Sequence, residues 1–169
     1  MWVNPASAGG TNEQELFTRG IYGADGYYAG IGGGTGASRG KFFLTGSSGT
    51  VGYTSTANAA AGVWQHVVFV NVSGNSGGLN IYINGVSQSV TSYTGFPTSS
   101  TRTAYLATYD GAAGSFFGGS MDEVRASNTV RSADWVTAEY NNQSSPSTFY
   151  AVSNFVSLAG STKGAGFVF

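Results

Sequence analysis

The 169-residue chain has no cysteine, only three prolines and few charged residues. Without cysteine no disulfide can stabilise the fold, so stability must come from a buried core, for which one domain of this length is large enough. Lys, Arg, Asp and Glu make up 9% of the residues, against roughly a quarter in ordinary globular domains. With a formal net charge of −1 and no Lys/Arg cluster, the chain lacks the attraction on which nucleic-acid binding depends. We expect no nucleic-acid partner.

The chain also lacks long apolar runs. No run approaches the about 18 residues that a membrane-spanning helix needs, and residues 1–5 have neither the charged start nor the apolar middle of a signal peptide. We therefore predict no membrane insertion. Polarity comes from 27 glycines and many Ser, Thr and Asn residues instead of charge. This composition favours an extracellular, cell-surface or virion-surface location.

Short β-strands separated by glycine-bearing turns are the dominant pattern. In residues 64–72 β-branched and aromatic residues follow one another, as in a central, mostly buried strand. In residues 79–83 apolar and more polar side chains alternate, as in a strand. Asn84-Gly85 then supplies the two residues with left-handed backbone conformation that a type I′ hairpin turn requires. Further strands are expected at residues 15–19, 27–31, 41–45, 50–55, 86–90, 103–108, 121–127 and 149–152. So many strands predict an all-β fold with two packed antiparallel sheets.

One short helix near the C-terminal end interrupts the β pattern. Ser132 is a suitable N-cap, and Asp134 lies in the first turn, where the helix dipole favours negative charge. Val136 and Tyr140 are four residues apart and therefore share a face. These signals predict a helix over residues 133–141.

Several segments, taken in order, carry a family resemblance: WVNP at 2–5, GVWQHV at 62–67, IYING at 81–85, FGGSMDEVR at 117–125, SADW at 132–135 and EY at 139–140. Together they resemble the laminin G-like domains of the concanavalin A-like jelly-roll family. The resemblance implies a two-sheet jelly-roll sandwich over residues 1–152. Residues 153–169 then form a C-terminal tail, which we interpret as an added strand or a docking segment.

Such domains usually begin with one or two strands before the WVNP element, which stands at the start of this sequence. Either the C-terminal tail or a neighbouring subunit supplies those strands, or the sequence is incomplete at this end. An unpaired sheet edge invites strand addition, so self-association or pairing with a scaffold protein is a predicted partner mode.

The doublet Asp122-Glu123 is the strongest chemical signal, because carboxylates inside an otherwise apolar strand need partners. In some related domains the Asp that matches Asp122 helps to ligate a structural calcium, and the resemblance implies this role here. In the other interpretation Glu123 and Arg125 pair with other charges, while Asp122 caps a turn or accepts backbone N–H groups. Both interpretations stay open from the sequence.

The jelly roll also hosts polysaccharide hydrolases, which need two carboxylates placed across the scissile bond. Glu13 and Glu15 share a face if their segment is extended, but no third acid continues the Glu-x-Asp-x-x-Glu pattern of those enzymes. The only histidine, His66, is expected to be a packed or hydrogen-bonded ring, because no Cys or activated-Ser motif accompanies it. We therefore predict a non-catalytic domain.

Glycan binding is the function that the loops favour, because aromatic faces and directional hydrogen bonds hold sugars. The candidate ligand-binding residues are Tyr22, Tyr27, Tyr28, Tyr93, Tyr109 and Asp110. Trp2, Trp64, Phe69 and Trp135 are expected to fill the core. The sequence thus predicts a recognition or adhesion module that binds a glycan or surface polysaccharide. The alternative is a structural subunit of a virion or surface assembly that self-associates.

Overall fold

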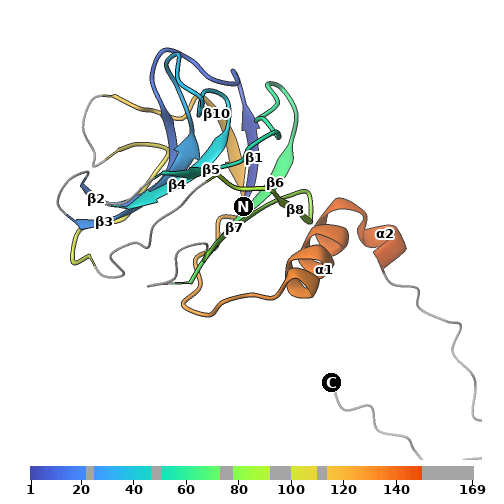
Figure 1. Cartoon of the computed structure of the whole chain (residues 1–169). Coiled ribbons are helices and arrows are strands. Elements are labelled where there is room, and N and C mark those ends of the chain that lie inside the picture. The colour runs from blue at the N-terminus through green and yellow to red at the C-terminus, as the bar shows by residue number, and fades with distance from the viewer. Residues whose placement is uncertain (22–24, 47–50, 73–77, 92–99, 110–113, 150–169) are drawn as a thin grey trace, which may run out of the picture.

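A computed structural model describes residues 1–21, 25–46, 51–72, 78–91, 100–109 and 114–149. In these residues ten strands form two five-stranded antiparallel sheets, and two helices follow near the C-terminal end (Figure 1). The sheets pack face to face as a jelly-roll sandwich, which confirms the predicted all-β architecture. Neither helix in the described ranges is long and apolar enough to cross a membrane.

The first sheet contains the strands nearest to the helices. Its order is β10 (Gly119–Asp122), β1 (Trp2–Pro5), β6 (Gln65–Asn71), β7 (Leu79–Ile83) and β8 (Val86–Gln88). β1 pairs with β10 on one side and with β6 on the other. The WVNP segment is therefore an interior strand, and β10 and β8 are the edges of this sheet.

The second sheet has the order β5 (Gly52–Tyr53), β4 (Phe42–Gly46), β3 (Asp25–Ile31), β2 (Gln14–Ile21) and β9 (Tyr105–Leu106). A β-bulge interrupts the register of β2 between Glu15 and Phe17. The two edge strands, β5 and β9, are much shorter than the predicted segments 50–55 and 103–108. Short edge strands present few unpaired backbone groups to another chain.

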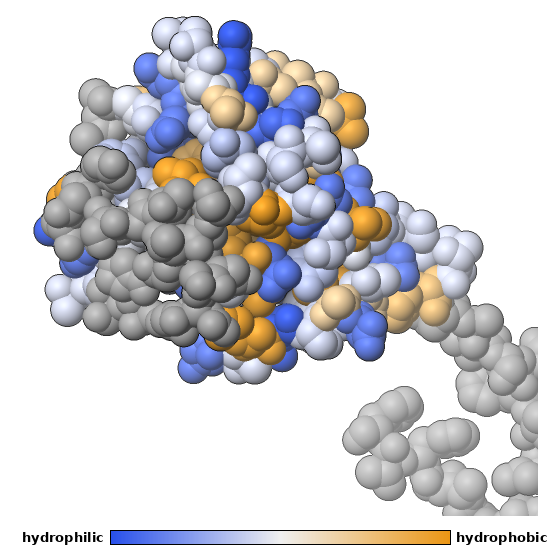
Figure 2. All heavy atoms as spheres, in the orientation of Figure 1, coloured by the Kyte–Doolittle hydropathy of each residue, from blue (hydrophilic) through white to orange (hydrophobic). Residues whose placement is uncertain are grey.

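The core lies between the two sheets. The first sheet contributes Val3, Val67, Leu79, Ile81 and Ile83, and the second sheet contributes Leu16, Ala29, Ile31, Phe42 and Leu44. Phe117, from the segment before β10, packs against the same cluster. Hydrophilic and weakly polar residues cover most of the face seen in Figure 2, with apolar residues in smaller patches.

Helix α1 (Ala133–Ser144) covers the outer face of the first sheet beside β7 and β8 (Figure 1). Its Val136 is fully buried against Val70 and Tyr82, which point away from the core. The Ser132 hydroxyl accepts a hydrogen bond from the Trp135 backbone N–H at 3.2 Å, so the predicted N-cap is confirmed. The helix continues three residues beyond its predicted end, and α2 (Pro146–Phe149) follows.

One strand prediction near the C-terminal end is wrong, and a second is wrong at its only described residue. β10 ends at Asp122 and does not continue over residues 121–127, because Glu123 has φ 49°, a left-handed conformation that ends the extended chain. The carboxylate doublet is therefore exposed at a strand end and not enclosed in a buried strand. Of the strand expected at residues 149–152, Phe149 belongs to α2. The rest of that segment and the whole 153–169 tail lie outside the described residues.

Candidate functional site

A hollow of about 660 Å³ lies between the outer face of the first sheet and the C-terminal half of α1. Its lining combines three aromatic residues, two carboxylates and three amides: Trp2, Trp64, Tyr140, Asp122, Glu123, Asn84, Asn142 and Gln143. A concave site with aromatic faces and a few polar groups is the usual form of a small-molecule binding site.

Strand register places part of this lining in one row. Asp122 of β10, Trp2 of β1 and His66 of β6 are direct neighbours across three adjacent strands. The Trp2 and His66 rings lie with their centres 5.2 Å apart. Because side chains alternate along a strand, Trp64 faces the same side as His66 two residues later. The outer face of the first sheet therefore forms the floor of the hollow.

Helix α1 supplies the opposite wall. The Tyr140 ring centre is 5.8 Å from that of Trp2 and 6.1 Å from that of His66, so the three rings form one cluster. The indole N–H of Trp2 donates a hydrogen bond to the side-chain oxygen of Gln143. This hydrogen bond and the ring contacts attach the helix to the strand and orient the aromatic floor.

The β7–β8 hairpin holds the base of the same cluster. Asn84 and Gly85 have φ 51° and 77°, as the predicted type I′ turn requires. The Asn84 side-chain oxygen accepts a hydrogen bond from the backbone N–H of His66 at 2.8 Å, which connects the turn to β6. A Cβ atom at Gly85 would lie 3.0 Å from the Tyr140 ring, so the missing side chain lets α1 approach the turn. The Thr137 hydroxyl donates to the Gly85 carbonyl at 3.0 Å.

The charged residues beside the hollow are connected by Arg125. Its guanidinium donates to Glu139 of α1 at 2.9 Å and also to Glu123. Asp122 accepts the Glu123 backbone N–H at 2.8 Å through Oδ1. The second interpretation of the doublet expected Glu123 and Arg125 to pair with other charges and Asp122 to accept a backbone donor. Arg125 does pair with another charge, Glu139, and Asp122 accepts a backbone donor, but Glu123 pairs with Arg125 itself.

Calcium binding by Asp122 stays a prediction. In the described part of the chain no group of three His, Cys, Asp or Glu side chains is arranged to hold a metal ion. Calcium takes six to eight oxygen ligands. The described side chains around Asp122 do not supply such a set, and we derive no role for a metal.

His66 is 1% exposed, and burial is the main reason why its pKa falls to about 4, with smaller effects of the Met1 amino group and Arg125. At neutral pH the ring is uncharged. It therefore forms no ion pair with Glu139, although its Nε2 lies 4.0 Å from Glu139 Oε2. The expectation of a packed ring is confirmed. Its Nδ1 has no hydrogen-bond partner among the described residues.

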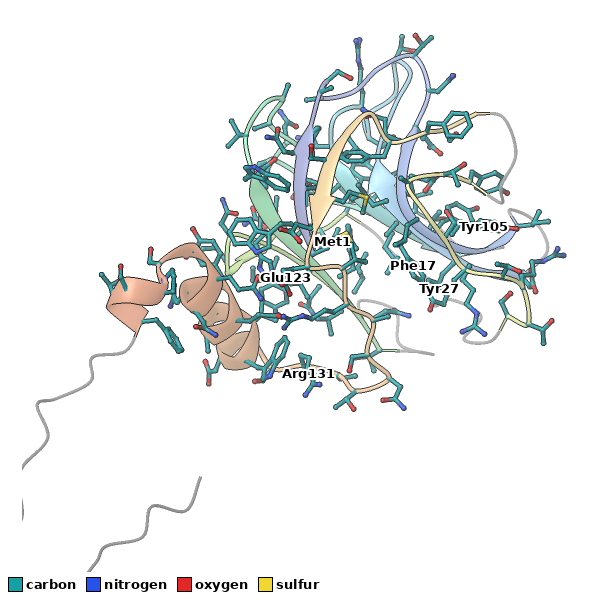
Figure 3. The ribbon with its side chains drawn as sticks, turned by 180° about the vertical axis from the view of Figure 1, so that it is seen from behind. Met1, Phe17, Tyr27, Tyr105, Glu123 and Arg131 are labelled. Carbon is teal, nitrogen blue, oxygen red and sulfur yellow. The ribbon has the colours of Figure 1, made fainter. Side chains whose placement is uncertain are left out.

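Of the predicted ligand-binding residues, the three that the structure describes, Tyr27, Tyr28 and Tyr109, do not line this hollow. Tyr22, Tyr93 and Asp110 lie outside the described residues. Tyr27 is half-buried and stacks on Phe17 with the ring centres 5.8 Å apart. Tyr28 is buried, and its ring is perpendicular to that of Tyr109 with the centres 5.6 Å apart. Tyr27 and Tyr28 belong to the second sheet. Figure 3 shows Met1 and Glu123 close to α1, with Phe17, Tyr27 and Tyr105 gathered farther from it.

The tryptophans that line the hollow, Trp2 and Trp64, were expected in the core, and this is wrong for both, because neither belongs to the buried cluster between the sheets. Trp64 is 44% exposed and Trp2 is half-buried. The alternation from Trp64 through His66 could have indicated their shared outer face. Trp135, also expected in the core, is 38% exposed outside the hollow, and the Arg131 guanidinium lies 4.6 Å from its ring centre. Phe69 is half-buried and packs against the core as expected.

Glu15, one of the two acids weighed as a hydrolase pair, is 1% exposed on β2. Burial, with a smaller effect of Glu13, raises the pKa of its carboxyl to about 8. Its Oε2 has no hydrogen-bond partner among the described residues. A carboxyl group this buried cannot contact a polymeric substrate without a rearrangement of the residues around it.

Comparison with known proteins gives one match. The family model described as the concanavalin A-like lectin/glucanases superfamily matches residues 1–137, which contain all ten described strands and the start of α1. Neither a search of curated proteins nor a search of solved structures found a match. The match covers every element of the hollow's floor.

Proposed function

The chain belongs to the concanavalin A-like lectin/glucanase superfamily, and from this premise we propose that it is a non-catalytic module that binds a glycan in the hollow beside α1. Membership supports a lectin-like or binding role in general. The observation that carries the finer proposal is the exposure of Trp64 in a hollow that also contains carboxylate and amide groups.

The chemistry of the lining suits a sugar. The face of a sugar ring carries C–H groups that pack on an indole, while its hydroxyls need donors and acceptors around the rim. Trp64 offers the aromatic face, Asp122 offers acceptors, and the Asn142 amide offers both donors and an acceptor. A volume of about 660 Å³ lies within the usual range of small-ligand sites, roughly 300–1,000 Å³.

The arrangement of carboxylates supports a binding role over hydrolysis. Glycoside hydrolysis needs one carboxyl group as proton donor and a second as base or nucleophile across the bond. In the hollow, Glu123 forms an ion pair with Arg125, and Asp122 accepts a hydrogen bond from a backbone N–H. Glu15, whose pKa is raised, is buried in the other sheet. A domain of this kind acts at a cell or virion surface, where glycans are displayed, and this location is part of the proposal.

A second candidate function is a structural subunit that self-associates. It is favoured by exposed apolar residues on two edge strands, Val86 of β8 at 62% and Leu106 of β9 at 50%. Another copy, or a scaffold protein, would cover these exposed apolar side chains. Size-exclusion chromatography with light scattering separates the two functions, because the glycan-binding module is expected to be a monomer that binds glycans. A stable oligomer that binds no glycan would favour the structural subunit.

The experiment for glycan binding uses an array to find a ligand and calorimetry to compare variants. Trp64→Ala should weaken binding about tenfold, because an exposed aromatic anchor contributes on the order of 1–2 kcal/mol. Trp135→Ala is the matched control, since Trp135 is similarly exposed but lies outside the hollow. Equal affinity of the Trp64→Ala variant and the wild type would show that the glycan binds elsewhere.

A further inference from the structure

The carboxylates around the hollow outnumber the cations beside them. Glu123 and Glu139 share the guanidinium of Arg125, and the Met1 amino group lies close enough to Glu139 to be affected by its charge. Asp122 has no ion-pair partner among the described residues, and one of its oxygens accepts only a backbone N–H. One full negative charge therefore remains uncompensated at the rim.

Helix α1 directs further negative potential into the same space. Asn142, Gln143 and Ser144 of its last turn line the hollow, and that turn contains no Lys, Arg or His. The free carbonyl groups at a helix C-terminus carry a partial negative charge, equivalent to about half an electron, which favours a nearby cation. His66, buried against the rings of Trp2 and Tyr140, is uncharged at neutral pH and does not offset this potential.

The exposed face of Trp64 completes the features that favour a cation. No ring or cation of the described residues is stacked on it, whereas Arg131 already covers Trp135 at 4.6 Å. An indole face attracts a cation through its quadrupole, and a nearby carboxylate attracts the same cation through its charge. Trp64 and Asp122 line one hollow, so a single bound ligand can contact both.

From these features we infer that the hollow selects glycans with an unsubstituted amino group, that is, amino sugars in their ammonium form. The inference rests on the proposed glycan-binding function and names its substrate class. The ammonium group would lie between the Trp64 ring and the Asp122 carboxylate, while neighbouring hydroxyls bond to the amides of α1. An N-acetylated sugar has no such charge, and an acidic sugar is repelled by Asp122 and by the end of the helix.

The test compares two oligosaccharides of equal length, a β-1,4-linked glucosamine hexamer and its fully N-acetylated counterpart, by calorimetry at mildly acidic pH. We expect the glucosamine hexamer to bind about tenfold more tightly, and the preference to shrink as salt is added, because a cation–π contact with a charge partner is worth on the order of 1–2 kcal/mol. Asp122→Asn should abolish the preference. The asparagine keeps the oxygen that accepts the Glu123 N–H, so the strand end is expected to fold normally.

The control is Asp134→Asn, which removes the same charge from the first turn of α1, at the far end of the helix from the hollow. It should leave the preference unchanged. Equal binding of the two hexamers, or a preference that survives Asp122→Asn, would overturn the selection of amino sugars and leave the proposed glycan-binding function standing. Failure to bind either hexamer or any other glycan on the array would overturn both.

Discussion

Two buried titratable residues, Glu15 and His66, have pKa values shifted in opposite directions by the same cause. Burial disfavours the charged form of each, which raises the pKa of Glu15 to about 8 and lowers that of His66 to about 4. A raised carboxyl pKa stabilises the fold below its unfolded value of 4.5, and this contribution is lost as the pH rises through 8. The lowered pKa of His66 has the opposite effect on stability. It stabilises the fold above pH 6.5, and this contribution is lost as the pH falls from 6.5 through 4.

Replacing Glu15 with glutamine isolates the first of these effects. Glutamine is a neutral isostere of the protonated acid, so the wild type should lose stability relative to Glu15→Gln as the pH rises from 4.5 to 8. The full change is roughly 4 kcal/mol in the free energy of unfolding. Urea denaturation of both proteins over this range measures it, and the contribution of His66 cancels in the difference. Asp134→Asn, an exposed control, should give no comparable trend. A difference that is independent of pH would contradict the account of Glu15.

Single residues also mark the limit of what the sequence could predict about the site. The left-handed pair Asn84-Gly85 was predictable, because its residue types suit only a few turns. The exposure of Trp64 was not recognised, since the apolar run that follows it suggests a strand buried on both faces, and such a strand has no clear alternation. The end of β10 could not be predicted either, because nothing in the Asp-Glu-Val-Arg segment signals the positive φ of Glu123.

Among the elements, the β7–β8 hairpin and α1 depend on each other. The turn contacts the helix through Gly85, and the helix contacts the first sheet through Val136, so both help to place Tyr140 at the hollow. The ranges of β2, β3, β4, β6 and β7 follow closely from strand propensity. The N-cap of α1 follows from Ser132, but its last turn does not follow from sequence, because the contacts that extend it come from Trp2 of a distant strand.

Gly85→Ala should destabilise the protein more than Gly62→Ala does. Both glycines have positive φ, 77° and 73°, so alanine strains the backbone at either position by about 1–2 kcal/mol. At Gly85 the new Cβ would also lie 3.0 Å from Tyr140, whereas at Gly62 it meets nothing within 4 Å. Overpacking adds about 1–3 kcal/mol. Chemical denaturation of both variants gives the comparison, and equal losses would show that the turn does not support the helix.

At the scale of the whole molecule, α1 and the outer face of the first sheet together enclose the hollow in which we propose that a glycan binds. The two-sheet sandwich was predictable because many short strands separated by glycine-rich turns have few alternative architectures. The position of the helix was not predictable from its own sequence. It results from the pairing of Val136 with Val70 and Tyr82, which are close only after the first sheet has formed.

Val136→Ala should therefore affect stability and ligand binding together. Val136 is fully buried, and the loss of two methyl groups should cost about 2 kcal/mol and loosen the wall that carries Tyr140 and Gln143. Val130→Ala, at a position that is 58% exposed, is the matched control and should change neither property. Thermal unfolding and glycan titration of the two variants check both effects. Unchanged glycan affinity in a destabilised Val136→Ala protein would show that the packing of α1 on the sheet does not contribute to glycan binding.

The central claim is that a glycan occupies the hollow between the first sheet and α1. The three tryptophans of the chain allow this to be observed directly, because each indole N–H gives its own signal in a proton–nitrogen NMR spectrum. Addition of a glycan selected on the array should shift the signals of Trp2 and Trp64, which line the hollow, and leave that of Trp135 in place. A shift confined to Trp135, or bound glycan with no change at Trp2 and Trp64, would contradict the account.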